Sequence, residues 1–490
     1  MAFTFPRRTR PRSSGPSVSK GAAGTGSSPG RKPHFSHRLD GSKAPGATSR
    51  YNAATPHVGT QITPSRPTTS SPLTYSAQSS ANRPGVEVVQ RTRGRDRLET
   101  YVEVRGFRGW TPLSFGLVAL VALLTTVGLV FVASSSSVYA LHRWGNPWNL
   151  FEKQVLFVGL GLVCFIITML LPYRAWRVAG PLLLGGSFLG VLATFSSLGI
   201  SKNGSTRWIG PESLAFQPSE VMKLGLAATL AVGLAEIEGH SDEQRKIRNQ
   251  IIVVLVLAIA PIFLQPDMGT AMILVSIVAS MIVATGLPGR VLLRYGLIGL
   301  GSTMLLAIVE PYRRDRLLAF MHPDKDPDGI GYHVMQSKMG FASGHFTGVG
   351  VGASRAKWGF LPNSYTDFIF AIIGEEIGMV GALLVMISFF LIALCGSHIA
   401  RRTDDRFASL LAVGITTWIV SQAVINMGAV IGTMPVTGVP LPFISKGGSS
   451  FVILMAAAGV LINIARHTRR VVRFGEAPRQ APSLHTVKVG

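Results

Sequence analysis

The chain has 490 residues, of which 47% are hydrophobic and only 14% charged, and its formal net charge is +23. A soluble domain carries about a quarter charged residues, and here the charges crowd into the first 100 residues and a few short segments. The composition excludes an ordinary soluble globular protein. It indicates a chain that crosses a membrane several times, because each helical crossing needs roughly 20 apolar residues.

The N-terminal segment is a different kind of sequence. Residues 1–100 are rich in Ser, Pro, Thr, Gly and Arg, and they hold 16 Lys and Arg against 4 Asp and Glu. Such a composition buries too little apolar surface to fold, and it contains no apolar core of a signal peptide. We predict a disordered, basic, cytoplasmic tail over 1–109 that is attracted to anionic membrane lipid. A docking arm for nucleic acid or protein is the less favoured alternative, and we expect no nucleic-acid partner.

Ten apolar segments follow the tail, so the predicted fold is an all-α polytopic membrane protein. The predicted spans are 113–134, 154–171, 178–196, 219–237, 250–264, 268–287, 290–310, 367–396, 407–430 and 449–465. They form a membrane domain over 110–470, followed by a short cytoplasmic tail over 471–490.

The orientation follows from the distribution of Lys and Arg. Most of the short connecting segments on one side of the spans carry several cations, and ten spans then place both termini in the cytoplasm. The segment 311–365, between the seventh and eighth spans, is a large extracellular segment that is also cationic. Long segments cross the membrane largely regardless of charge. An anionic substrate at the outer surface would explain these cations, and ordinary solvation of scattered charges explains them equally well.

Local chemistry separates the four carboxylates of this large extracellular segment. Asp315 stands among arginines and is expected to be paired, Asp324 can cap the following turn, and Asp328 precedes a glycine in a turn dipeptide. Asp326 precedes Pro327, which favours an extended backbone and removes the next amide donor. Asp326 is therefore the best-exposed candidate for a catalytic carboxylate. Downstream, the pattern over 332–341 predicts a short amphipathic helix, either on the membrane surface or packed on the bundle.

Polar side chains also occur within or beside the spans, where burial in lipid is costly. Glu220 and Lys223 lie on one face of the fourth span, and Gln422 and Asn426 lie one turn apart in the ninth. For each of them a structural hydrogen bond between helices is the favoured interpretation. Their gathering near the outer ends of several spans raises the chance of a shared cavity.

Six motifs in this order resemble the SEDS family (shape, elongation, division and sporulation), and their wording is closer to its division branch than to its elongation branch. The motifs are QPSEVMKL (217–224), QPDMGTA (265–271), PYRRDR (311–316), DPDGIGYHVMQS (326–337), FLPNSYTDFIFAIIGEEIG (360–378) and MPVTGVPLPFISKGGSS (434–450). The resemblance covers roughly residues 110–470. Two segments depart from it: Lys446 stands where a tyrosine is usual, and Asn363 and Tyr365 replace an acidic residue and a histidine.

The resemblance implies a peptidoglycan glycosyltransferase that polymerises lipid II, the undecaprenyl-pyrophosphate disaccharide pentapeptide, at the outer face of the membrane. It implies that Asp326 is the general base that accepts the proton of the acceptor GlcNAc 4-hydroxyl. The attacked atom would be the MurNAc anomeric carbon, and the leaving pyrophosphate needs cations. The expected phosphate-binding cations are Arg207, Arg313, Arg316 and Lys338. The other expected lining residues are Gln265, Asp267, Tyr332, Gln336, Asp367 and Lys446.

The resemblance further implies partners and a location. The expected partners are a class B penicillin-binding transpeptidase and other divisome proteins, and the expected location is the bacterial cytoplasmic membrane at the division septum. A divalent cation, Mg or Mn, is compatible with the pyrophosphate, although no ligand cluster in the sequence requires one. Three alternatives stay open: a lipid II flippase, an elongation polymerase of the same family, and a scaffold that recruits a partner.

Overall fold

The computed structural model describes residues 86–92, 98–104, 109–468 and 470–474. The gaps within the third range are 203–204, 212–214, 237–253, 255–257, 259, 263, 266, 287–313, 315, 317, 319 and 323–328. Asp326 and Arg313 therefore lie outside the described residues, as do the whole of the predicted seventh span, 290–310, and most of the fifth.

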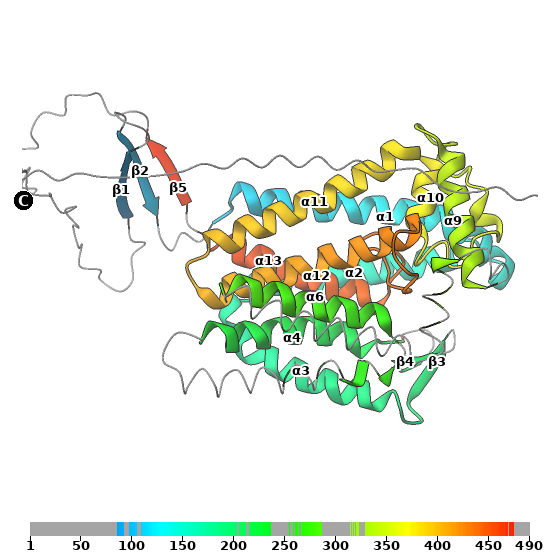
Figure 1. Cartoon of the computed structure of the whole chain (residues 1–490), viewed down its shortest axis with the longest axis horizontal. Helices are drawn as coiled ribbons and strands as arrows, with labels where there is room; N and C mark the ends of the chain where they lie inside the picture. The colour runs from blue at the N-terminus through cyan, green and yellow to red at the C-terminus, as the bar shows by residue number, and fades with distance from the viewer. Residues whose placement is uncertain are drawn as a thin grey trace, which may run out of the picture. The chain divides into compact units, whose positions relative to one another are not determined.

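The described part of the membrane domain is a bundle of long helices that run side by side (Figure 1). The longer helices are α1 (Pro112–Trp144), α2 (Asn149–Leu170), α3 (Trp176–Ala193), α4 (Pro218–Ala235), α6 (Met268–Ala284), α11 (Gly378–Arg402), α12 (Arg406–Ile431) and α13 (Ser449–Ala465). The shorter ones are η1 (Tyr173–Ala175), α9 (Ile330–Gly344), η4 (Ala356–Trp358) and α10 (Ile369–Glu376). Among the described residues, five helical segments are long and apolar enough to cross a membrane, and α6 and α13 are shorter apolar helices. The predicted fold class, a polytopic helical membrane protein, is confirmed.

Two helices differ from the predicted spans. The first extends to Trp144, about ten residues beyond its predicted end, and stops at Gly145, whose φ of 70° is left-handed and favours glycine. The predicted eighth span, 367–396, is two helices: α10 ends at Glu376, and α11 begins at Gly378, whose φ is 75°. This break separates a short helix at one end of the bundle from the long α11.

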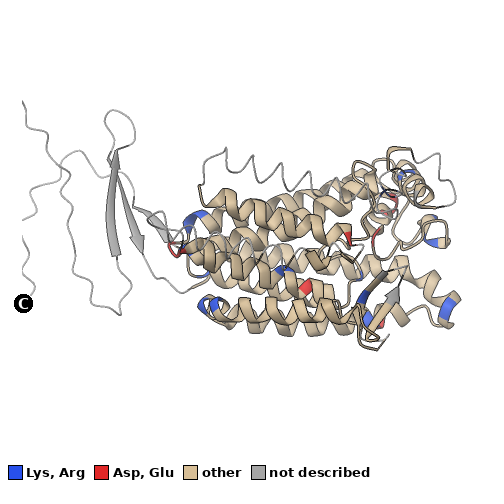
Figure 2. Ribbon diagram, turned by 60° about the horizontal axis from the view of Figure 1, so that its bottom comes forward, with Lys and Arg blue, Asp and Glu red and all other residues tan. Residues whose placement is uncertain are grey.

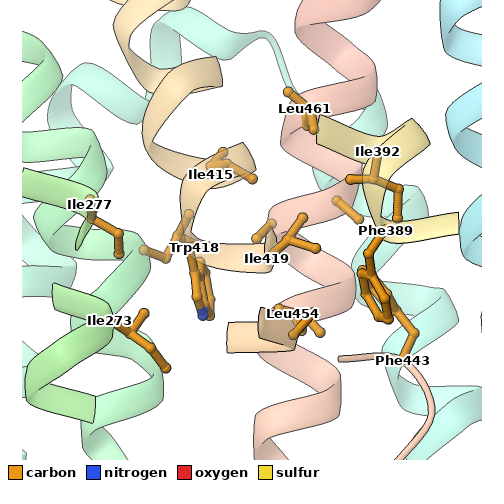
Figure 3. Packing of buried hydrophobic residues seen from close by; sticks show 14 of the residues in the cluster. Ile273, Ile277, Phe389, Ile392, Ile415, Trp418, Ile419, Phe443, Leu454 and Leu461 are labelled. Carbon is orange, nitrogen blue, oxygen red and sulfur yellow. The ribbon is translucent and has the colours of Figure 1, made fainter. Parts of the chain in front are cut away.

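The interior of the bundle is assembled around α12. Trp418 and Ile419 of α12 pack between Ile273 and Ile277 of α6 on one side and Leu454 of α13 on the other (Figure 3). Many apolar side chains on the bundle's outer surface are instead exposed, as expected where lipid rather than water covers them. Figure 2 shows that most of the described charged residues gather toward the two ends of the bundle.

Small residues allow two helix pairs to approach closely, which is a usual basis of helix association in lipid. At Gly180 of α3, an added Cβ would lie 2.6 Å from the Cβ of Ala228 in α4. At Gly459 of α13, it would lie 2.5 Å from the carbonyl oxygen of Phe165 in α2. These contacts hold α3 against α4 and α2 against α13 without any bulky side chain between them.

Two small sheets were not predicted. Strands β1 (Val86–Thr92), β2 (Leu98–Val104) and β5 (Arg470–Phe474) form an antiparallel sheet in the order β1-β2-β5. The sequence predicts a disordered tail over 1–109, and both β1 and β2 differ from that expectation. Strands β3 (Gly199–Lys202) and β4 (Ser205–Ile209) form a hairpin between α3 and α4, with a register shift at Ile200/Ser201.

The predicted amphipathic helix is present as α9, and it packs on the bundle. Val334 is buried, and the Ser337 hydroxyl donates to the carbonyl oxygen of Val430 in α12 at 2.8 Å. An added Cβ at Gly344 would clash with the backbone of Gly374 in α10. These contacts place α9 firmly at the end of the bundle that holds the cavity described next.

Candidate functional site

One end of the bundle holds a large cavity of about 1230 Å³. It is lined by the end of α1, the beginning of α2, strand β4, the beginnings of α4 and α6, and His333 of α9. Two loops complete it, 363–368 before α10 and 436–448 before α13. These segments belong to the connections that the sequence places on one face of the membrane, and the structure brings them to a single site.

Two amide side chains of α12 hold both loops in place. Asn426 donates through Nδ2 to the carbonyl oxygens of Asp367, at 2.8 Å, and Val439, at 2.7 Å. One turn earlier, Gln422 donates to the carbonyl oxygen of Pro440 at 3.0 Å. Because buried backbone carbonyls need partners, these two side chains determine where the loops can lie. Gln422 also accepts a hydrogen bond from Lys223 of α4, as predicted for a bond between helices, whereas the two Asn426 bonds run to loops instead.

Asp267 lies at the beginning of α6 and is almost fully buried. Its carboxylate caps the helix, accepting from the Thr270 amide at 3.1 Å and from the Thr270 hydroxyl at 2.9 Å. Arg207 of β4 reaches the same carboxylate, with Nη1 at 3.4 Å from Oδ1. The hairpin β3–β4 therefore places the Arg207 guanidinium at the cavity, where it pairs with Asp267 at the beginning of α6.

Asp367, in the loop before α10, is the second acid of the cavity. Burial raises the pKa of this carboxyl to about 6, against the opposing pull of the Arg316 and Arg207 guanidinium groups. Arg316 donates through Nη1 to the carbonyl oxygen of Val436 at 2.9 Å, which ties it to the second loop. Two arginines from distant segments therefore converge on the part of the cavity that holds both aspartates.

A buried ion pair adjoins the inner side of the cavity. Glu220 lines the cavity and Lys223 lies one turn further into α4, with Nζ 2.8 Å from Glu220 Oε1. Lys223 Nζ also donates to Gln422 Oε1 at 3.2 Å and lies 5.3 Å from the centre of the Trp418 ring. Among the described residues, Glu220 Oε2 is buried without a hydrogen-bond partner.

The structure brings five of the predicted site residues to the cavity: Arg207, Asp267, Arg316, Asp367 and Lys446. Four others do not line it. The Gln265 side chain is buried and donates to the Thr194 hydroxyl. Tyr332 and Gln336 lie on α9 outside the lining, and Lys338 borders a separate apolar groove of about 290 Å³. The predicted residues on α9 lie within 332–338. Because side chains point to all sides of a helix over such a stretch, only some of them can face the cavity.

Sequence reasoning missed other lining residues. His333 lines the cavity, and its ring stacks on Phe368 at 5.8 Å between centroids and an interplanar angle of 12°. Tyr139 and Trp144 line it because α1 runs further than predicted. The only signal for His333 was its position within the large polar segment. Tyr139 and Trp144 lie beyond the end of the predicted first span, 113–134, and a longer predicted helix would have been needed to find them.

The described residues do not provide a set of metal ligands. No group of three or more His, Cys, Asp or Glu side chains is gathered among them. Asp267 is paired with Arg207, and Asp367 lies near two arginines, so neither is a ready partner for a divalent cation. A divalent cation on the substrate pyrophosphate stays a prediction.

The fold and the cavity define a polytopic helical membrane protein with a charged site at one end of its bundle. Residues 115–470 match the sequence profile of the FtsW/RodA/SpoVE family, described as cell cycle proteins, and the chain belongs to this family.

Two relatives illustrate the similarity. The chain is 37% identical over 354 residues to stage V sporulation protein E of Bacillus subtilis, covering 72% of this chain and 97% of that protein. It is 38% identical over 364 residues to the probable peptidoglycan glycosyltransferase FtsW of Mycobacterium tuberculosis, covering 74% and 70%.

Two solved structures are also similar to this chain. One chain, from a study of the structural coordination of polymerization and crosslinking by a peptidoglycan synthase complex, superposes with a TM-score of 0.60 at 28% identity, covering 73% of this chain and 98% of that one. The rod shape determining protein RodA of Thermus thermophilus superposes with a TM-score of 0.55 at 26% identity, with the same coverage.

Proposed function

We propose that this protein polymerises lipid II into glycan strands at the outer face of the cytoplasmic membrane during septal wall synthesis. Family membership makes it a peptidoglycan glycosyltransferase. The observation that carries the more specific proposal is the cavity, in which Arg207 and Arg316 converge beside Asp267 and Asp367. The cavity end of the bundle is the outer one, and both termini lie in the cytoplasm.

The reaction needs a proton acceptor, because a sugar hydroxyl is a poor nucleophile. We assign this role to Asp326, which takes the proton of the acceptor GlcNAc 4-hydroxyl as the oxygen attacks the MurNAc anomeric carbon, with inversion. Asp326 itself lies outside the described residues. Support comes from the chain on either side of it, because both Arg316 and His333 line the cavity.

The leaving pyrophosphate takes up negative charge as the glycosidic bond breaks. Preorganised cations aimed at that charge stabilise the transition state, and an arginine fork suits phosphate oxygens. Arg207 and Arg316 fit this role because each is fixed by a second contact, to Asp267 and to the Val436 carbonyl respectively. The polyprenyl tails would lie against the apolar outer surface of the bundle, so that substrate enters sideways from the lipid.

A transpeptidase partner fits the same proposal. The structural relative belongs to a complex that coordinates polymerization and crosslinking, and we infer that this chain works with a class B penicillin-binding protein and other division proteins. Polymerisation by the purified chain should therefore rise when its cognate transpeptidase is added. An equal rate with and without the partner would argue against regulation by the complex.

The decisive experiment is to incubate the purified full-length protein and its transpeptidase with lipid II and to analyse the glycan products on gels. Asp326→Asn should abolish polymer formation while leaving lipid II binding largely intact. Asp324→Asn, which changes a carboxylate two residues away, is the matched control and should keep activity. Polymer made by Asp326→Asn would remove the base assignment. A protein that moves lipid II across vesicles but never polymerises it would favour the flippase alternative.

A further inference from the structure

The segment that follows α9, residues 345–360, has an inverted distribution of polar and apolar side chains. Four apolar side chains are between 56% and 68% exposed: Phe346, Val351, Trp358 and Phe360. Two polar side chains of the same segment, Ser354 and Lys357, are buried. A segment that faces water shows the opposite distribution, because water excludes apolar surface and solvates charge. An exposed apolar patch of this kind marks a surface that binds lipid or protein.

Two adjacent acids at the end of α10 hold the polar side chains of this segment against the bundle. The Glu375 carboxylate accepts a hydrogen bond from the Ser354 hydroxyl. The Lys357 ammonium lies 3.7 Å from the Glu376 carboxylate, which also accepts from the Ser134 hydroxyl of α1 at 2.8 Å. Because these contacts turn the polar groups inward, the apolar side chains of the segment are left on the outer surface.

The segment lies at the level where α11 enters the membrane. Helix α11 is long and apolar enough to cross a membrane, and Arg401 stands in its last turn. An α-helix rises about 1.5 Å per residue, so the roughly 20 residues that cross a hydrocarbon core of about 30 Å reach from Arg401 back to about Gly381. The Val380 amide donates to the Phe346 carbonyl oxygen at 3.3 Å. This bond places Phe346 at the boundary between the hydrocarbon and the lipid headgroups.

The apolar patch of the segment continues the lipid-facing surface of α11. Val380 and Leu384, one turn apart on this helix, are 50% and 59% exposed, as expected for side chains that lipid covers. Phe346 adjoins them through its bond to Val380. The composition fits the same surroundings, because residues 345–360 contain Arg355 and Lys357 but no Asp or Glu, and cations suit a surface of lipid phosphates. These observations favour lipid over a protein partner as the cover of the patch.

We propose that residues 345–360 form a membrane-surface anchor at the cavity end of the bundle. Phe346, Trp358 and Phe360 enter the boundary between lipid headgroups and acyl chains, where amphipathic rings such as that of tryptophan gather. The exposed Arg355 lies among the lipid phosphates. Because the segment follows α9 directly, the anchor also sets the height of α9 above the bilayer. The inference is independent of the reaction proposed for the cavity.

The anchor is tested by measuring the depth of a spin label in the purified full-length protein, held in nanodiscs of phosphatidylcholine and phosphatidylglycerol. Cys164 and Cys395 are first replaced by alanine, and one label is attached at Val351→Cys, which leaves the three aromatic rings in place. The readout is the ratio of label collisions with oxygen, which concentrates in the bilayer, to collisions with a nickel chelate, which stays in water. Leu384→Cys gives the lipid reference, and Asp404→Cys, an exposed position between α11 and α12, gives the water reference. The Val351 label should show a ratio several-fold above the water reference.

A double variant tests whether the aromatic rings hold the segment in the lipid. Trp358→Ser/Phe360→Ser, made in the Val351→Cys protein, should move the ratio of that label toward the water reference, because the two rings no longer favour the boundary. Trp148→Ser is the matched control: it removes another exposed tryptophan, in the connection between α1 and α2, and should leave the ratio unchanged. Thermal unfolding of each variant shows that it is folded.

Three outcomes would overturn the inference. The first is a Val351 label that the nickel chelate reaches as readily as it reaches the label at Asp404→Cys. The second is a ratio that does not change in the double variant, or that changes equally in Trp148→Ser. The third is a label that water reaches in the nanodisc and that becomes shielded only when the transpeptidase is added, since the patch would then be a protein interface.

Discussion

Lys223 and Glu220 form an ion pair of 2.8 Å inside the helical bundle, one turn apart on α4, with both side chains almost fully buried. Charges in such an environment are tolerated only when they are paired and hydrogen-bonded. Gln422 of α12 supplies the additional acceptor for Lys223 and donates to the loop at Pro440. One polar network therefore joins the inner side of the cavity to the helix that positions its loops.

Removing Lys223 alone should lower the stability of the protein much more than removing both charges of the Lys223–Glu220 ion pair. Lys223→Met leaves Glu220 as a buried carboxylate without a cation, which costs on the order of 3–5 kcal/mol. The double variant Lys223→Met/Glu220→Gln removes both charges and should regain most of that loss. Thermal unfolding in detergent measures both. If the double variant is no more stable than Lys223→Met, the pair is not the origin of the effect.

The stability of the protein should depend on Asp367 in a mildly acidic pH window. The pKa of this carboxyl is raised from 3.8 to about 6 by burial, so the folded protein holds a proton that the unfolded chain releases earlier. Stability from this group is therefore fully present below about pH 3.8 and is lost as pH rises toward about 6. The loss should be on the order of 1 kcal/mol, because the half-buried side chain keeps part of its hydration.

Asp367→Asn isolates this contribution. Its unfolding temperature should fall less than that of the wild type as pH is raised from about 4 to about 7, and the two profiles should run parallel above that range. Profiles that differ by a constant amount at every pH would show that Asp367 does not titrate in this window.

The two cavity loops should loosen together when Asn426 is shortened. Asn426→Ala leaves the carbonyls of Asp367 and Val439 without their donor, at a cost of roughly 1–3 kcal/mol for each buried group left unsatisfied. We expect lower thermal stability and a larger loss of polymerisation than stability alone explains. Ser421→Ala is the control and should be nearly neutral, because the Ser421 hydroxyl donates to the carbonyl oxygen of Trp418 on the same helix.

Glu375 should hold the segment that follows α9. Its carboxylate accepts from the Ser354 hydroxyl and from the backbone amides of Arg355 and Ala356, at 2.9 and 3.3 Å for the amides. Glu375→Ala removes these acceptors, so trypsin should cut after Arg355 several-fold faster than in the wild type. Glu152→Ala, which changes an exposed acid on α2, should leave the cleavage rate unchanged. Equal cleavage of Glu375→Ala and wild type would mean that other contacts hold the segment.

The sequence alone determined the elements that depend on local composition. Long apolar runs located α2, α3, α4, α6, α12 and α13 closely, because a membrane demands that each span carry its own apolar surface and satisfy its own backbone. It also identified Arg207, Asp267, Arg316, Asp367 and Lys446 as polar groups in connecting segments. The family motifs added an interpretation for them.

Only the tertiary structure decided which of these groups meet. Arg207 faces Asp267 because hairpin β3–β4 folds over the beginning of α6, and Gln265, two residues away, turns inward to Thr194 instead. The extension of α1 to Trp144 and the break at Gly378 depend on packing against neighbours rather than on hydropathy. Hydropathy and motif order are properties of one segment at a time, whereas a cavity wall such as Lys446, Tyr365 and Tyr139 exists only once distant segments are packed together.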